Sequence, residues 1–157
     1  MSYNNLIDAT AAYKILCELE DYKKASCVIV KHGNPCGVTI DNSVSGAYKK
    51  ALETDPVSAF GGIVGMNKKV DEKLAKTISS IFTEVIIAKS FSPRAIKILS
   101  FKKNIKIIDI RSFDGALLDK EEIRSVIGGY LIQETSISKA NDEELEVVTK
   151  GNLAREN

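Results

Sequence analysis

The sequence predicts an α/β fold in which helices cover both faces of a β-sheet. Strand-like apolar runs alternate with segments whose apolar residues recur every three to four positions, as in amphipathic helices. Such alternation is typical of crossover units and indicates a largely parallel sheet between helical layers. The composition fits a globular protein, because 44% of the residues are hydrophobic and 27% are charged. With 157 residues, the chain is one domain or part of a larger one.

Four helices are expected, and each begins at a residue type that caps helix N-termini. The first opens at Asn5, with Asp8 as its capping partner, and runs to about Glu20. The other three are expected from Asp41 or Asn42 to Asp55, from Asp71 to about Phe82, and from Ser92 to about Lys102. Pro56 ends the second helix, because proline disfavours helical geometry in the residue before it. Pro93 suits the first position of the fourth helix.

Five strands are expected between these helices. The first covers residues 25–30, and its continuous apolar run predicts burial on both faces. The others are expected at residues 59–66, 85–88, 105–110 and 129–133. The polar stretch from Ser136 onward has no assigned element, and residues 151–157 are typical of a frayed end.

The charge balance excludes several classes of protein. Lysine and arginine together number 22 against 21 acidic residues, which gives a net charge of +1. Proteins that bind nucleic acids or membrane surfaces usually carry a clustered basic excess, so neither partner is expected. No apolar run approaches the length that crosses a bilayer, and a soluble protein is expected.

The cysteines argue against both a disulfide framework and a zinc site. Cys17, Cys27 and Cys36 are odd in number and lack CxxC spacing, and the chain has a single histidine. Reduced thiols indicate a cytoplasmic protein. Cys36 is a weak candidate nucleophile, because its surroundings predict neither a helix N-terminus nor an orienting third group. We expect it to pack as a small buried residue.

The segment KHGNPCG, residues 31–37, holds the strongest candidates for catalysis. Its His32 is the only histidine of the chain and directly follows a strand. An imidazole can accept or donate a proton near neutral pH, and Lys31 adds a positive charge beside it. Adjacent strand residues normally point to opposite faces, so both side chains reach one ligand only if the strand has begun to turn. Gly33 and Pro35 favour such a turn.

The glycine-rich segment GGIVG, residues 61–65, has two interpretations. It lacks the spacing of known phosphate-binding loops. Gly61 and Gly62 can permit a bend at the entrance of a strand, or they can let the backbone approach a small ligand with free N–H groups.

Glu84, directly before the third expected strand, is also open to two interpretations. It is either a solvated surface acid or a carboxylate that binds a substrate amine or amide. Ligands of α/β sheets bind beyond the carboxyl ends of strands. Of the three features, only KHGNPCG lies clearly at such an end, and the position of the other two stays open.

Taken together, these segments resemble a known family. The matching blocks are VIVKHGNPCG at 28–37, TDPVSAFGGIVGMN at 54–67, FTEVIIA at 82–88 and ILSFKKN at 98–104. They are similar to the aminoimidazole carboxamide ribonucleotide (AICAR) transformylase domain of bifunctional purine biosynthesis proteins. The resemblance covers nearly the whole chain, and the KHxNPCG and DPVSAFGG blocks are its most specific parts.

This resemblance implies a fold, a reaction and roles for individual residues. The implied fold is a three-layer, cytidine-deaminase-like mixed sheet flanked by helices. The implied reaction transfers a formyl group from 10-formyltetrahydrofolate, the co-substrate, to the 5-amino group of AICAR. His32 would be the general base, and Lys31 would stabilise the developing oxyanion or assist proton transfer to the leaving folate nitrogen. Phe60 and Gly61 would line the site of the nucleotide base, and Glu84 would contact AICAR. No zinc is expected.

The resemblance also sets the expected extent of the domain. Residues 1–157 match the first lobe of the transformylase domain, whereas the cyclohydrolase domain and the second lobe are expected to be absent. The isolated chain should therefore be incomplete and inactive, and the full enzyme is expected to be a homodimer. The alternative interpretation is a non-catalytic small-molecule-binding or dimerisation module with the same fold.

Overall fold

The computed structural model describes residues 1–113 and 121–135, which belong to two units. The first unit comprises Met1–Leu117 and the second Leu118–Asn157. The polar tail considered above, from Ser136 onward, lies outside the described residues.

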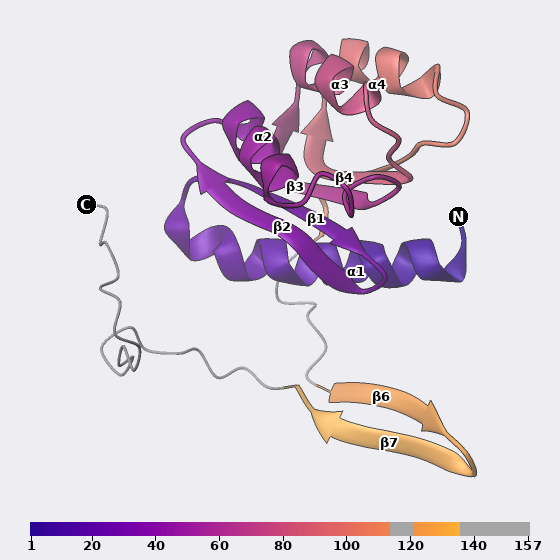
Figure 1. The fold of residues 1–157 in the computed structure, drawn as a ribbon. Coiled ribbons are helices and arrows are strands. Elements are labelled where there is room, and N and C mark those ends of the chain that lie inside the picture. The colour runs from indigo at the N-terminus through magenta and orange to yellow at the C-terminus, as the bar shows by residue number, and fades with distance from the viewer. Residues whose placement is uncertain (114–120, 136–157) are drawn as a thin grey trace. The chain divides into compact units, whose positions relative to one another are not determined.

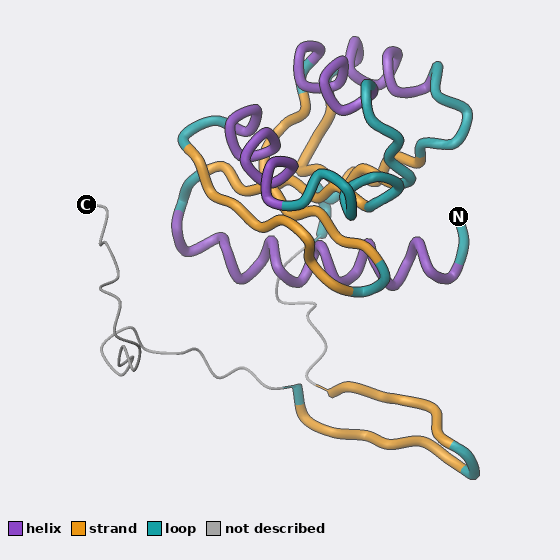
Figure 2. Tube along the Cα trace, viewed as in Figure 1, coloured by secondary structure: helices purple, strands orange, loops and turns teal. Residues whose placement is uncertain are grey.

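The first unit holds a five-stranded sheet and the helices that flank it. Its elements are, in chain order, α1 (Tyr3–Glu18), η1 (Leu19–Tyr22), β1 (Ala25–Lys31), β2 (Asn34–Asp41), α2 (Val44–Thr54), β3 (Ile63–Val70), α3 (Glu72–Ser79), β4 (Val85–Phe91), α4 (Pro93–Ser100) and β5 (Lys106–Asp109). Figure 1 shows α1 on one face of the sheet and α2, α3 and α4 on the other. The three-layer α/β architecture is therefore confirmed, and Figure 2 shows its strands as the middle layer.

The sheet is mixed, with the strand order β2-β1-β3-β4-β5. β3, β4 and β5 are parallel to one another, whereas β1 is antiparallel to both β2 and β3. The mixed sheet that the family resemblance implies is confirmed. The largely parallel sheet expected from the alternation of elements is wrong for the β1–β2 half.

The strand β2 was not expected from the sequence, which indicated a turn from residue 33 to 37. The turn is shorter and comprises only His32 and Gly33, after which the chain pairs back along β1. Pro35 obscures the strand signal, but β2 is an edge strand, where a proline is tolerated. Gly37 is also explained by packing, because a Cβ atom there would collide with the backbone carbonyl of Ala51 in α2.

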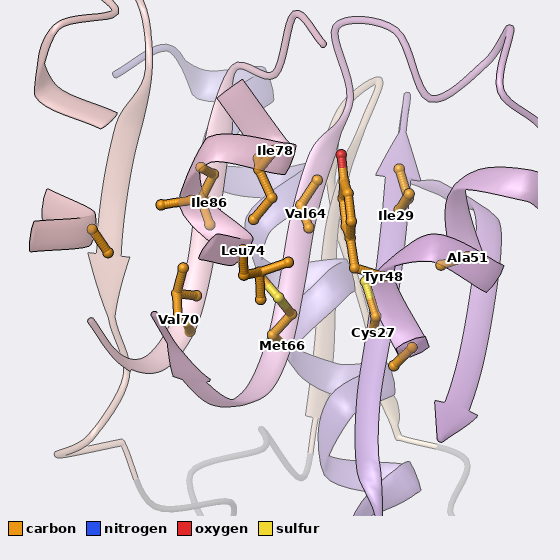
Figure 3. Close-up of a cluster of buried hydrophobic side chains, with 14 of the residues drawn as sticks. Cys27, Ile29, Tyr48, Ala51, Val64, Met66, Val70, Leu74, Ile78 and Ile86 are labelled. Carbon is orange, nitrogen blue, oxygen red and sulfur yellow. The ribbon is translucent and has the colours of Figure 1, made fainter. Parts of the chain in front are cut away.

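Apolar residues of β1 are buried on both faces of the sheet, as predicted. Cys27 and Ile29 pack into the cluster beneath α2, α3 and α4, whereas Val28 and Val30 pack against α1. Figure 3 shows the first of these clusters, in which Tyr48 of α2 is almost fully buried. A strand covered by helices on both faces needs such a continuous apolar run.

The start of α1 differs from the prediction. Ser2 is the N-cap and accepts a hydrogen bond from the Asn5 N–H, while the Asn5 side chain accepts one from the Ser2 N–H. This is a capping box in which Asn5 is the N3 residue, whereas the prediction made it the N-cap. The carboxylate of Asp8 is therefore not part of the cap and is available for contacts elsewhere.

The other helix starts agree more closely with the sequence. Asp71 and Ser92 cap α3 and α4 as expected. The cap of α2 is Ser43, and the expected cap Asp41 instead accepts a hydrogen bond from the Ser43 N–H. β3 begins at Ile63 because residues 59–62 form a turn.

The second unit contains an antiparallel hairpin of β6 (Glu121–Val126) and β7 (Gly129–Glu134). The expected strand at 129–133 is confirmed, while β6 was missed because its charged residues mask the alternation. Ile123 and Ile132 face each other across the two strands, and both side chains are exposed.

Candidate functional site

One end of the five-stranded sheet gathers the segments that the sequence singled out. In the sheet, Val30 of β1 pairs with Ile63 of β3, and Ile63 pairs with Val85 of β4. Since β1 runs antiparallel to β3 and β4, its carboxyl end lies beside their amino ends. KHGNPCG, the glycine-rich turn and Glu84 thus meet at a single edge, which resolves their relative position.

A cavity of about 460 Å³ opens at this edge. It is lined by all five residues that the sequence predicts for the site, namely Lys31, His32, Phe60, Gly61 and Glu84. Further lining comes from the start of α1, including Asn5 and Asp8, and from Phe82.

His32 reaches this cavity because the chain reverses directly after β1. His32 has φ +54° and Gly33 has φ +76°, so both residues adopt the left-handed conformation that type I′ hairpin turns require. For a residue with a Cβ atom this conformation is strained. Lys31 and His32 both line the cavity. This geometry is consistent with the expectation that the chain turns directly after Lys31, so that both side chains can reach one ligand.

Asp8 and Asn34 hold the turn by hydrogen bonds. The His32 N–H donates to Asp8 Oδ2 at 3.2 Å, and the Gly33 N–H donates to Asp8 Oδ1 at 2.6 Å. On the other side, Asn34 Nδ2 donates to the His32 carbonyl at 3.0 Å. The backbone around the imidazole is therefore fixed from both sides.

Lys31 joins the end of β1 to the turn before β3. Its Nζ donates to the Phe60 carbonyl at 2.8 Å. Phe60 is 58% exposed as a residue, and its ring contacts the Phe82 ring in a tilted arrangement with 5.4 Å between the centroids. A partly exposed aromatic pair beside an ammonium group suits a flat, polar ligand.

The glycine-rich turn supports the bend interpretation. The Gly61 N–H donates to the Phe82 carbonyl at 2.8 Å, and the Gly62 N–H donates to the Ala59 carbonyl at 3.0 Å. Neither amide is therefore free to bind a ligand, and that part of the alternative interpretation is wrong. Gly61 has φ +75°, and an added Cβ atom would lie 3.4 Å from the Phe82 ring. Glycine at this position keeps the cavity wall thin and the turn unstrained.

Glu84 is half-buried rather than a solvated surface acid. Its Oε2 accepts a hydrogen bond of 2.6 Å from Nδ2 of Asn5, which is itself buried. Its backbone is fixed by pairing on both sides, since its N–H donates to the Gly62 carbonyl and its carbonyl accepts from the Lys106 N–H. The carboxylate is thus oriented at the cavity wall.

Sequence reasoning missed Asn5 and Asp8 as residues of the site, because it paired them as a helix cap. The signal that could have found them is Ser2, which lies three residues before Asn5 and completes the capping box. With the cap placed at Ser2, Asn5 and Asp8 fall one turn apart on α1 and on the same face.

Cys36 does not line the cavity. Its Sγ donates to the Ile29 carbonyl at 3.5 Å and packs against the cluster beneath α2. Burial raises the pKa of the Cys36 thiol, and the nearby Asp55 raises it further. The packing interpretation is therefore favoured over a nucleophile.

Two further observations concern residues 1–113 and 121–135 only. Among them, no group of three or more His, Cys, Asp or Glu side chains could hold a metal ion. No helix among them is both long enough and apolar enough to cross a membrane.

Comparison with solved structures relates the fold to known proteins. RibD from Acinetobacter baumannii, in its second crystal form, aligns with a TM-score of 0.51 over 75% of this chain and 39% of its own. A putative formate dehydrogenase accessory protein from Desulfotalea psychrophila aligns with a TM-score of 0.50 over 62% of this chain and 50% of its own. The sequence identities are 15% and 12%, so these likenesses concern the fold alone. The fold is deaminase-like.

Comparison of sequences is more specific. The chain is 49% identical over 150 residues to the bifunctional purine biosynthesis protein PurH of Fusobacterium nucleatum, and 43% identical over 150 residues to that of Aquifex aeolicus. Each alignment covers 96% of this chain and 28% of the relative, so the chain spans less than a third of their length. The family model of the AICARFT/IMPCHase bienzyme matches residues 1–157. The chain therefore belongs to the AICARFT/IMPCHase bienzyme family.

Proposed function

We propose that this chain contributes to purine biosynthesis as part of a bifunctional enzyme, in which its cavity takes part in formyl transfer from 10-formyltetrahydrofolate to the 5-amino group of AICAR. The main observation in support of the proposal is that Lys31, His32 and Glu84 line the same cavity. Membership of the AICARFT/IMPCHase bienzyme family supports the choice of substrates.

The reaction needs a base and a positive charge. The amine nitrogen of AICAR attacks the formyl carbon, and the carbonyl oxygen gains negative charge in the tetrahedral intermediate. In the proposed mechanism, His32 accepts the proton that the amine loses. Lys31 stabilises the oxyanion or assists protonation of the folate nitrogen when its bond to the formyl carbon breaks. Tetrahydrofolate and formylated AICAR are the products.

The remaining site residues suit a purine precursor. The exposed ring of Phe60 can stack on the imidazole ring of AICAR, and Gly61 leaves room for that ring to approach the turn. The carboxylate of Glu84, held by Asn5, can accept a hydrogen bond from the amine or the carboxamide of AICAR.

The activity is proposed for the full-length protein rather than for these residues alone. The chain spans 28% of the length of its relatives, and the proposal includes that the folate site and the nucleotide phosphate site draw on the rest of that length. It also includes a homodimer as the active form and no zinc in the mechanism.

The test uses a chimera in which this chain replaces the matching segment of the Fusobacterium nucleatum relative, hereafter the full-length chimera. We expect formyl transfer by the chimera, and we expect His32→Ala to lower kcat by about 10²- to 10⁴-fold while AICAR still binds. The control is Cys36→Ser, which alters a polar group outside the cavity and should keep turnover.

Two outcomes would count against the proposal. Near-normal turnover by a folded His32→Ala chimera would remove His32 as the base. Binding of AICAR without formyl transfer by the unsubstituted chimera would instead favour the non-catalytic binding module.

A further inference from the structure

The side chain of Asp8 makes two contacts that the proposed chemistry does not use. It projects from α1 one turn after Asn5, and its two oxygens accept hydrogen bonds from the N–H groups of His32 and Gly33, at 3.2 and 2.6 Å. A carboxylate is suited to this task because each oxygen can accept from one of two adjacent amides. An amide side chain in its place would offer one oxygen and would turn an NH₂ group toward the second N–H.

The turn that Asp8 holds is strained at His32. The imidazole-bearing residue has φ +54°, which L-residues with a Cβ atom rarely adopt. The neighbouring Gly33 adopts φ +76° without such strain. Strained conformations persist only where surrounding contacts over-determine them, and they cluster at functional sites. The two bonds from Asp8 and the bond from Asn34 are the contacts that fix this conformation.

The core of the domain does not depend on these bonds. His32 and Gly33 are exposed and Asp8 is half-buried, and without Asp8 the two exposed N–H groups could bond to water. β1 and β2 would still pair from Ala25 to Lys31. Loss of the carboxylate would therefore remove few packing contacts. It would let the turn sample other conformations, in which the imidazole no longer faces the cavity.

From these contacts we propose that Asp8 is a positioning residue, which locks the His32–Gly33 turn so that the imidazole is presented to the cavity in a single orientation. Together with Asn5, which holds Glu84, Asp8 makes one face of α1 the scaffold for two sides of the site. The expected change in kcat rests on the proposed function. The locked turn does not, because it is a structural property of the chain.

The first experiment measures the turn without any assay of activity. Backbone NMR of the chain follows the amide exchange rates of His32 and Gly33 and the chemical shifts that report the left-handed conformation of His32. In Asp8→Asn we expect exchange at Gly33 to accelerate by about tenfold and the His32 shifts to move toward averaged values. The matched control is Asp41→Asn, which removes another carboxylate bonded to a backbone N–H but lies outside the cavity. It should leave both amides unchanged.

The second experiment measures the kinetic consequence in the full-length chimera. We expect Asp8→Asn to lower kcat by about 10- to 100-fold, because misplacement of a catalytic group by a small distance has effects of this size. The KM for AICAR should change by less than about threefold, a split that a loss of fold or of substrate binding would not produce.

The outcomes separate this inference from the proposed function. Unchanged exchange and shifts at His32 and Gly33 in Asp8→Asn would overturn the locked turn, whatever the activity. A freed turn with unchanged kcat in an active chimera would overturn the positioning role. If the unsubstituted chimera does not transfer formyl groups, the proposed function fails, and the NMR result still decides whether Asp8 locks the turn.

Discussion

The two ends of the five-stranded sheet use their polar residues in different ways. At the cavity end, where β1 finishes and β3 and β4 begin, Lys31, His32 and Glu84 line an open cavity. At the opposite end, which we name the far end and which includes Asp41 and Asn67, both side chains bond to backbone groups, and Asn67 also lines a smaller cavity of about 160 Å³. There Asn67 accepts from the buried Ser26 N–H and donates to the Lys24 carbonyl, both at 2.8 Å.

The difference separates residues that stabilise the fold from residues that are available to a ligand. A buried N–H without a partner is costly, so a side chain that satisfies it contributes to the free energy of unfolding. At the cavity end, the strained φ of His32 lowers the free energy of unfolding. The same conformation places the imidazole at the cavity. Mutations of polar residues should therefore affect stability differently at the two ends of the sheet.

The largest effect on stability is expected from Asn67→Ala at the far end. The variant leaves the fully buried Ser26 N–H unsatisfied, so the free energy of unfolding should fall by about 1–3 kcal/mol. Urea denaturation of the chain measures the loss. The control at the cavity end is Asn4→Ala, an exposed position whose change should stay within about 0.5 kcal/mol. Equal losses at the two ends would contradict the division.

A smaller effect of unusual sign is expected at His32. His32→Gly and His32→Ala both remove the imidazole, but glycine adopts φ +54° without strain, so the glycine variant should be more stable by about 1 kcal/mol. Thermal or urea unfolding of the two variants measures the difference. At the exposed helical position Lys73, the same pair should show the reverse order by up to about 1 kcal/mol. The same order at both positions would show that His32 is not strained.

The smallest effect is expected from Asp41, a half-buried acid at the far end of the sheet. The Lys50 ammonium and the Ser43 N–H hold the pKa of its carboxyl at about 2, below the ordinary value of 3.8. Because the folded state binds the proton less tightly, the contribution to stability is complete above pH 3.8 and is lost as the pH falls through about 2.

The measurement for Asp41 is the difference in Tm between the unsubstituted chain and Asp41→Asn. That difference should shrink between pH 5 and pH 2, and it should be small throughout because surface ion pairs contribute little. A difference that stays constant over this range would show that the carboxylate does not act through its charge.

Local sequence signals predicted much of the secondary structure of the first unit. The apolar run at 25–30, the caps Asp71 and Ser92 and the position of Pro93 act within a few residues, so the corresponding elements formed as expected. The missed elements are those in which local signals conflict. β2 contains a proline and a glycine that are tolerated only because it is an edge strand packed closely against α2.

The candidate site was predictable only in part. The family resemblance singled out Lys31, His32, Phe60, Gly61 and Glu84, and all five line one cavity. Their catalytic and binding roles remain predictions. Asn5 and Asp8 were missed: a cap placed at Ser2 would have set them on one face of α1, but their partners Glu84, His32 and Gly33 are distant in sequence and are known only from the fold.

The sequence by itself determined the layers of the α/β fold, the burial of β1 on both faces and the residue types that the site can use. Only the tertiary structure decided that these residues meet. That depends on the direction of β1, which the hairpin with β2 and its pairing with β3 set antiparallel to the strands beyond. Periodicity records which face of a strand is buried but not which way the strand runs beside its neighbours, since side chains alternate identically in both directions.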